Sequence, residues 1–142
     1  MVNVFKLISK VSHKPFMQIS KRYHWYKIAQ NEDELDFGVN NLLQLEVGEK
    51  SICIARQKDE LTACSGKCPH ASGLLADGYI DPLGNIVCPV HRYRFSLQNG
   101  RNVSGEGYHL KTYPVEIRED GVYVGIGEGG LLSKLFHSTD EQ

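Results

Sequence analysis

Short runs of apolar, β-branched and aromatic residues recur along most of the chain, and this pattern predicts a β-structure. From Tyr23 onward the runs alternate with turn residues such as Gly48 and Asp59. The strands we expect are Tyr23–Ile28, Leu42–Val47, Ser51–Arg56, Leu61–Cys64, Ile86–Cys88, Arg94–Leu97, Thr112–Arg118 and Val122–Ile126. Strands this short and this regularly spaced are typical of an antiparallel sandwich or a small barrel. No glycine-rich phosphate loop follows any of them, which argues against a nucleotide-binding βαβ fold.

Two dipeptides and one long segment interrupt the strand pattern. Asn99-Gly100 and Asp120-Gly121 predict hairpin turns of the kind that requires positive φ angles. The segment 68–85 is rich in Gly, Pro, Asp and Ser, which predicts a loop. Loops carried by a rigid sheet often hold functional residues, so this segment is the first place to look for chemistry.

The first residues of the chain follow a helical rather than a strand period. The apolar positions at helical spacing are Val4, Leu7, Ile8 and Val11. They predict a short amphipathic helix that ends before Pro15, with lysines on its other side. This helix is either a surface anchor, a presequence or a docking arm, or a segment that is folded on its own domain or partly disordered. We therefore expect a basic N-terminal arm over 1–20, a folded domain over 21–128 and a tail over 129–142.

Composition limits the classes of protein to which the chain can belong. A chain of 142 residues with 41% hydrophobic and 23% charged residues suits one globular domain. Its longest apolar runs are too short for a membrane-spanning helix, and Lys6 and Lys10 interrupt any secretory pattern. The four cysteines are too few for a disulfide scaffold, so we expect a reducing, cytoplasmic location.

The net charge of −1 conceals an uneven distribution. Residues 1–31 hold six of the 16 lysines and arginines and no carboxylate, which gives +6. Residues 32–142 hold the other ten together with all 17 carboxylates, which gives −7. Phosphates would repel this acidic body, which argues against a nucleic-acid partner. The same charge could steer the protein toward a basic protein partner.

Two Cys-His pairs stand out as candidate metal ligands. They are Cys68-Pro69-His70 and Cys88-Pro89-Val90-His91, spaced as C-x-H, seventeen residues and C-x2-H. Each pair combines a thiolate and an imidazole on a short predicted loop, and a proline follows each cysteine. Both groups are good ligands for transition metals. Two pairs with the same features make coincidence improbable.

These residues resemble the signature of the Rieske-type [2Fe–2S] proteins. The matching positions are Cys68-Pro69-His70, Gly73, Leu75, Gly78, Cys88-Pro89-Val90-His91, Phe95 and Gly100. The resemblance implies an antiparallel β-sandwich with a cluster-binding loop subdomain, and one [2Fe–2S] cluster per chain. It further implies that Cys68 and Cys88 bind one iron through sulfur. His70 and His91 would bind the other iron through ring nitrogens.

The resemblance also implies where the reduction potential lies. Two thiolates and two neutral imidazoles leave the oxidised site uncharged, so it accepts an electron more easily than a four-cysteine site does. High-potential members of the family have a disulfide between the cluster loops, where this chain has Gly73 and Val90. They also have serine and tyrosine hydroxyl donors, where this chain has Tyr93 and Phe95. We therefore expect the lower end of the family range of about −150 to +300 mV.

Two features around the cluster depart from the family or fit two interpretations. The third loop of the family commonly carries a proline, but the segment 103–110 has none and contains two glycines, which predicts a more flexible cover. Arg92 and Arg94 flank His91, where they could contact a partner, raise the local potential or be solvated.

The function that the resemblance implies is one-electron transfer. The chain looks like a ferredoxin that takes electrons from a flavoprotein reductase and passes them to an oxygenase or another redox acceptor protein. Rieske oxygenases add a catalytic domain with a mononuclear iron, and too few residues follow His91 to hold one. We therefore expect an electron-transfer component without a substrate site. Two alternatives stay open: a small subunit of a nitrite-reductase-like complex, and a redox sensor.

A structural zinc site is the strongest chemical alternative, since zinc also binds two cysteines and two histidines. The one-residue gap between Cys68 and His70 fits the usual zinc spacing poorly. A Cys-His nucleophile is a weaker alternative, because it leaves one pair without a role. We expect Cys53 and Cys64 to be buried thiols. Histidines without a cysteine at ligand spacing are His24, His109 and His137.

Overall fold

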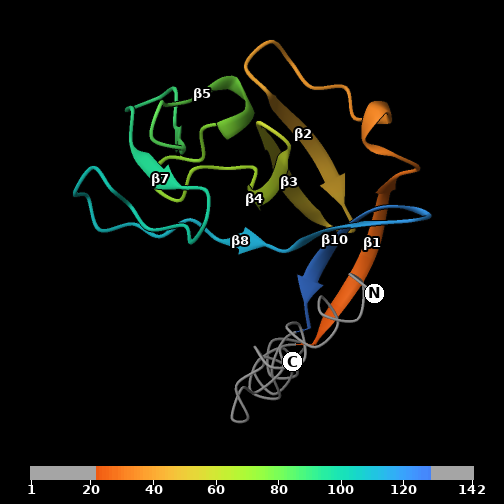
Figure 1. Ribbon diagram of the computed structural model, residues 1–142. Helices are drawn as coiled ribbons and strands as arrows, with labels where there is room; N and C mark the ends of the chain where they lie inside the picture. Colours follow the sequence, from red (N-terminus) through yellow and green to blue (C-terminus); the bar gives the residue numbers. More distant parts are fainter. Residues whose placement is uncertain (1–21, 129–142) are drawn as a thin grey trace, which may run out of the picture. The chain divides into compact units, whose positions relative to one another are not determined.

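The computed structural model describes residues 22–128, of which Tyr23–Gly127 form one compact unit (Figure 1). The arm and the tail expected from the sequence lie outside the described residues. The strands are β1 (Tyr23–Ala29), β2 (Leu42–Val47), β3 (Lys50–Gln57), β4 (Glu60–Ser65), β5 (Tyr79–Ile80), β6 (Asn85–Val87), β7 (Arg94–Ser96), β8 (Thr112–Tyr113), β9 (Val115–Arg118) and β10 (Gly121–Gly127). Two short 3-10 helices in this part of the chain are η1 (Glu32–Glu34) and η2 (Leu75–Asp77). None of its helices is long and apolar enough to cross a membrane.

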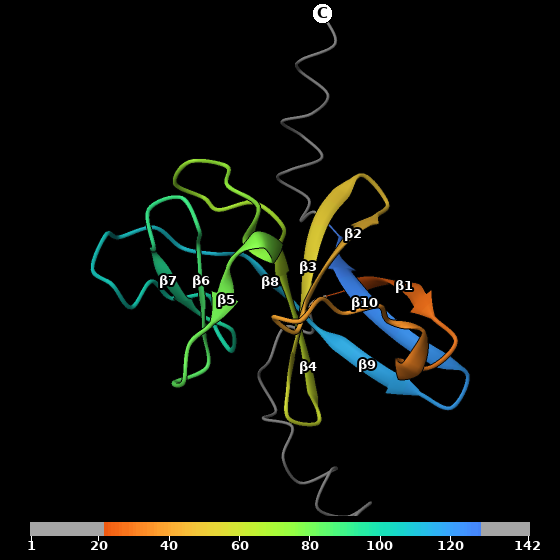
Figure 2. The ribbon, with the colours of Figure 1, turned by 90° about the horizontal axis from the view of Figure 1, so that it is seen from above.

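The strands form three antiparallel sheets, which confirms the predicted all-β antiparallel fold. The first sheet has the order β1-β10-β9, the second β2-β3-β4-β8 and the third β5-β6-β7. Figure 2 shows the four-stranded sheet between the two three-stranded ones. In the first sheet Tyr23 lies opposite Gly127, so the first and last strands of the compact unit pair with each other.

Strand β3 shows why the middle sheet is buried on both faces. Ile52 and Ile54 point to one face and pack against β10. Cys53 and Ala55 point to the opposite face and pack in a second core with Ile86 of β6. All five side chains are fully buried. Because side chains alternate across a strand, a strand covered on both faces needs an uninterrupted apolar run such as this one.

The sequence predicts one strand over Thr112–Arg118, but Pro114 divides it. β8 pairs with β4 of the middle sheet, whereas β9 pairs with β10 of the first sheet. Proline has no N–H to donate to a ladder, so the chain can leave one sheet at this residue and join the next. The carbonyl of Pro114 still accepts the N–H of Gly125 (2.9 Å).

Two further predictions about local structure need correction. The sequence predicts a loop throughout 68–85, but Tyr79–Ile80 forms β5 and pairs with β6. It also predicts Asp120-Gly121 as a turn. The structure places Glu119 and Asp120 between the strands, with Gly121 paired to Arg118 as the first residue of β10. The prediction at the other dipeptide holds, since Gly100 has a φ of 76° in a turn.

Candidate metal centre

The first Cys-His loop, residues 68–73, is a turn closed by its own backbone. The N–H of Ser72 donates to the carbonyl of Cys68 (3.0 Å), and the N–H of Cys68 donates to the carbonyl of Gly73 (2.8 Å). Ser72 has a φ of 56°, a left-handed conformation that lets the chain reverse direction. Strand β4 precedes the loop, so the middle sheet determines where it begins.

The second Cys-His loop, residues 88–93, repeats this geometry at the end of β6. The N–H of Arg92 donates to the carbonyl of Cys88 (2.9 Å), and the N–H of Cys88 donates to the carbonyl of Tyr93 (2.9 Å). Arg92 has a φ of 58°. The two loops therefore share one backbone turn, although histidine stands two residues after the cysteine in the first loop and three residues after it in the second.

Across the two loops the four predicted ligand side chains form two pairs, one of thiols and one of imidazoles. Cys68 and Cys88 are 3% and 1% exposed, and their thiols are close enough for Cys88 to raise the pKa of Cys68. His70 is half-buried and His91 is exposed. The Nδ1 atoms of the two imidazoles lie 3.2 Å apart. Two buried sulfurs and two ring nitrogens nearer to solvent form a donor set that could hold a metal group.

The Cys68 sulfur is buried but receives backbone hydrogen bonds. Burial raises the pKa of Cys68, and the adjacent Cys88 thiol raises it further. The N–H groups of His70 and Ala71 donate to this sulfur and act in the opposite direction. Such donors stabilise a thiolate, which is the form of cysteine that binds metals.

A glycine lets the two loops approach closely. A Cβ at Gly73 would lie 2.5 Å from Cγ2 of Val90 and 3.2 Å from the sulfur of Cys88. The first distance is far below an ordinary contact, so a larger residue at position 73 would displace the Val90 side chain of the second loop. These are the two positions where high-potential relatives were expected to have a disulfide.

Aromatic rings surround His70. The rings of Tyr93 and Tyr108 lie 4.4 and 5.1 Å from the imidazole, between ring centres. The Tyr93 hydroxyl is 3.5 Å from Nε2 of His70. Phe95 is fully buried. Tyr108 comes from the third loop, and its ring contact with His70 was not evident from the sequence.

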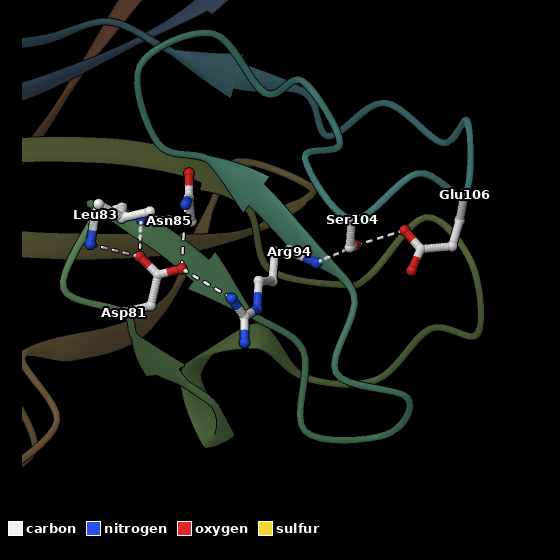
Figure 3. Close-up of polar contacts among 6 residues, drawn as sticks. All are labelled: Asp81, Leu83, Asn85, Arg94, Ser104 and Glu106. Carbon is white, nitrogen blue, oxygen red and sulfur yellow. Dashed lines mark hydrogen bonds and ion pairs between the residues drawn. The ribbon is translucent and has the colours of Figure 1, made fainter.

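The third loop, residues 101–110, is held by side-chain hydrogen bonds. Oδ1 of Asn102 accepts the N–H groups of Gly105 (2.7 Å) and Glu106 (2.9 Å). The Ser104 hydroxyl accepts the N–H of Arg94 (2.9 Å) and donates to Glu106 (2.5 Å), as Figure 3 shows. The hydrogen bond from Ser104 lowers the pKa of Glu106. These hydrogen bonds tie the loop to β7, and the flexible cover that its two glycines predict stays a prediction.

A buried carboxylate fixes the strand that leads into the second Cys-His loop. Asp81 is 7% exposed and accepts the N–H groups of Leu83 and Asn85, both at 2.9 Å. It also lies 3.9 Å from the Arg94 guanidinium on β7 (Figure 3). Burial opposes ionisation, but the hydrogen bonds from Asn85 and Leu83 and the charge of Arg94 together lower the pKa of Asp81. The sequence Asp-Pro-Leu-Gly-Asn is a turn signature that could have revealed this role.

Within residues 22–128, Cys53, Cys64 and His24 belong to strands β3, β4 and β1 and not to the Cys-His loops. Cys53 and Cys64 face each other across β3 and β4, fully buried and with their thiols hydrogen-bonded to each other. They are therefore the buried thiols that the sequence predicts. His24 packs on the Tyr26 ring at 4.6 Å. The prediction about His137 lies outside the described residues.

Residues 24–114 match the model of the Rieske [2Fe-2S] domain family. The match covers more than half of the chain and includes both Cys-His loops. The chain therefore belongs to the Rieske [2Fe–2S] family, and its cofactor is one [2Fe–2S] cluster.

The chain is similar to curated proteins of two kinds, ferredoxin components of oxygenase systems and a nitrite reductase. The chain is 26% identical over 80 residues to the ferredoxin component of the alkene monooxygenase system of Xanthobacter autotrophicus, covering 56% of this chain and 66% of that protein. It is 30% identical over 81 residues to the anthranilate 1,2-dioxygenase ferredoxin subunit of Burkholderia cepacia, covering 56% and 74%. It is 35% identical over 82 residues to a nitrite reductase [NAD(P)H] of Emericella nidulans, covering 52% of this chain and 7% of that protein.

Solved structures show the same fold. A complex of reduced oxygenase and oxidised ferredoxin in carbazole 1,9a-dioxygenase contains a chain that is 26% identical, with a TM-score of 0.61 over 71% of this chain and 92% of that one. A putative NADH-dependent nitrite reductase small subunit from Mycobacterium tuberculosis is 16% identical, with a TM-score of 0.66 over 76% and 99%.

The residues present fit a [2Fe–2S] group. The buried thiols lie together, the imidazole Nδ1 atoms converge, and Gly73 leaves room for the loops to close. Two sulfurs and two nitrogens are the donors that Rieske centres require.

Proposed function

We propose that Cys68 and Cys88 hold one iron of the cluster and that His70 and His91 hold the other. The observation that carries this assignment is the 3.2 Å approach of the two Nδ1 atoms in loops that also hold the two buried thiols. When bound, the cluster supplies the ability to take up and release one electron. The chain contributes burial of the sulfurs and an exposed imidazole edge through which a partner can be reached.

The protein is a one-electron carrier of the ferredoxin type. We propose that its electrons come from a flavoprotein reductase and go to an oxygenase. The ferredoxin components and subunits of monooxygenase and dioxygenase systems among its relatives support this proposal. A ferredoxin bound to its oxygenase in the carbazole 1,9a-dioxygenase system supports it as well.

A nitrite-reductase-like complex is the second candidate for the protein's assembly. Its support is the 35% identity to a domain-sized part of the fungal nitrite reductase. Under either candidate we place the protein in the cytoplasm, because a reducing compartment keeps all four of its cysteines free to act as thiols.

We also propose a potential near the lower end of the Rieske range, about −150 mV. Phe95 has no hydroxyl to donate. The Tyr93 hydroxyl is turned to the imidazole of His70. Fewer hydrogen bonds to the cluster sulfurs stabilise the added electron less.

Anaerobic assembly with iron and sulfide tests the assignment. The loaded protein should be red-brown and should give a Rieske-type electron paramagnetic resonance signal when reduced. The His91→Ala variant should lose that signal, because one ring nitrogen of the donor set is removed. His109→Ala, which removes an exposed imidazole elsewhere, is the matched control and should keep it. An unchanged signal in His91→Ala removes His91 from the ligand set.

A further inference from the structure

The charges of the described domain are distributed unevenly over its surface. Residues 22–128 hold 11 lysines and arginines against 15 carboxylates, a net charge of −4. The segments 66–74 and 88–93, which contain the two Cys-His loops, hold Lys67 and Arg92 and no carboxylate. The remaining residues therefore hold nine cations against 15 carboxylates. The end of the domain with the candidate ligands is basic, and the rest is acidic.

Other charged groups near the loops reduce this positive charge but do not reverse its sign. The third loop adds Arg101 and Glu106, and the Glu106 carboxylate interacts with His70 and Tyr93. The reduced cluster adds one more negative charge, so Lys67, Arg92 and Arg101 still exceed these negative charges by one. The Arg94 guanidinium lies 3.9 Å from the Asp81 carboxylate, so its charge is compensated locally. Lys67 and Arg92 have exposed side chains.

Exposed apolar side chains lie beside these two cations. Leu74, Val90 and Tyr108 are 41%, 51% and 41% exposed. Leu74 is bridged to Lys67, and the ring of Tyr108 lies 5.1 Å from that of His70. Val90 belongs to the second loop, one residue before His91. We call the set Lys67, Leu74, Val90, Arg92 and Tyr108 the tip surface. Apolar patches rimmed by charge are typical of protein interaction sites.

We propose that the electron-transfer partner binds the tip surface through an acidic site with an apolar centre. This inference rests on the proposed function and specifies the partner's chemistry. At contact, charges more than a Debye length of about 8 Å away are largely screened, so the nearby cations decide the sign of the interaction. The distant carboxylates turn the basic end of the domain toward an acidic partner. The net charge of the domain alone would suggest a basic partner. The charges near the two Cys-His loops indicate an acidic partner instead.

Two small inorganic oxidants of opposite charge can test the sign of the charge at the tip surface, and no partner protein needs to be known. The reduced, loaded protein is mixed in a stopped-flow instrument with hexacyanoferrate(III), an anion, or with tris(phenanthroline)cobalt(III), a cation. Each oxidant takes one electron from one protein and becomes the iron(II) or cobalt(II) complex. The rate constant with the anion should fall about threefold or more between ~0.01 and ~0.2 M salt, and that with the cation should rise. The opposite pair of slopes overturns the proposal.

Two charge-reversal variants, one at the tip surface and one elsewhere, show which charges determine the salt dependence of the rate constants. Lys67→Glu combined with Arg92→Glu should reverse the salt dependence with both oxidants. Lys27→Glu combined with Lys58→Glu changes the net charge equally, but on β1 and in the β3–β4 turn, and should leave the signs as in the wild type. If the control pair reverses the slopes as fully as the tip pair does, whole-molecule charge governs the reaction and the proposal fails.

The two proposals fail in different ways. A wild-type protein that stays colourless after assembly overturns the ligand assignment and, with it, the docking inference. The docking inference alone is overturned if a red-brown protein reacts with both oxidants but the salt dependence of its rate constants is that of a negatively charged molecule. Visible absorption of each variant before mixing reports its cluster content, so rate constants refer to loaded protein.

Discussion

At the scale of single residues, the approach of the two Cys-His loops depends on a missing side chain. Gly73 faces Val90, and there is no space for a Cβ between them. The ring of His70 is held on one side by Tyr93 and on another by Tyr108. The donor set is therefore shaped by neighbours that do not themselves coordinate metal.

The Gly73→Ala variant should be destabilised and should bind less cluster. Overpacking of this kind costs about 1–3 kcal/mol, because the new methyl group pushes the second loop away. Thermal unfolding and the visible absorption of the assembled protein measure the two effects. Adding Val90→Ala removes the methyl group that clashes and should recover part of both losses. A Gly73→Ala protein with wild-type stability and cluster content contradicts the close approach.

At the scale of elements, most strands could be predicted because their apolar runs are local features of the sequence. The run from Ile52 to Ala55 predicts β3, and its burial on both faces explains why it does not alternate. Strand β5 could not be predicted, since Tyr79–Ile80 is too short to show a period and pairs only through β6. The division at Pro114 depends on two sheets lying side by side, and the residue alone does not specify it.

The sequence alone proposes the four candidate ligands but not the residues around them. A metal group requires particular donors at particular spacings, and Cys68 and His91 are such donors. Asp81, Ser104 and Tyr108 act through contacts with segments that are distant in sequence. Only folding brings those segments together, so a single sequence holds little signal for them.

Replacement of Asp81 by Asn tests how much this buried carboxylate stabilises the turn before β6, the strand that leads into the second Cys-His loop. The charged hydrogen bonds and the ion pair to Arg94 are lost, which should lower the free energy of unfolding by about 1–3 kcal/mol near neutral pH. The pKa of Asp81 is lowered in the folded state, so its contribution is present above the ordinary aspartate range and is lost as pH falls through the folded pKa. The wild type should therefore lose stability more steeply than Asp81→Asn below about pH 4.

Urea unfolding across this pH range measures the difference. Asp59→Asn changes an exposed carboxylate in the β3–β4 turn and is the control. If Asp81→Asn and Asp59→Asn follow the same pH curve as the wild type, the buried carboxylate does not stabilise the folded state.

At the scale of the whole molecule, the compact unit contains every candidate ligand. Both Cys-His loops, the third loop and the strands that carry them lie within Tyr23–Gly127. We therefore expect that deletion of residues 1–20 leaves cluster binding and the reduced-state resonance signal unchanged. Side-by-side assembly of the shortened and full-length chains measures this, and loss of the cluster from the shortened chain would falsify the boundary at residue 20.

The self-closed backbone of the two Cys-His loops has a consequence for maturation of the protein. Each turn is closed by main-chain hydrogen bonds and contains one left-handed residue. A closed turn has fewer accessible conformations than an open loop of the same length. We therefore expect the cysteine and the histidine of each loop to move together, as one unit, when iron and sulfide are inserted.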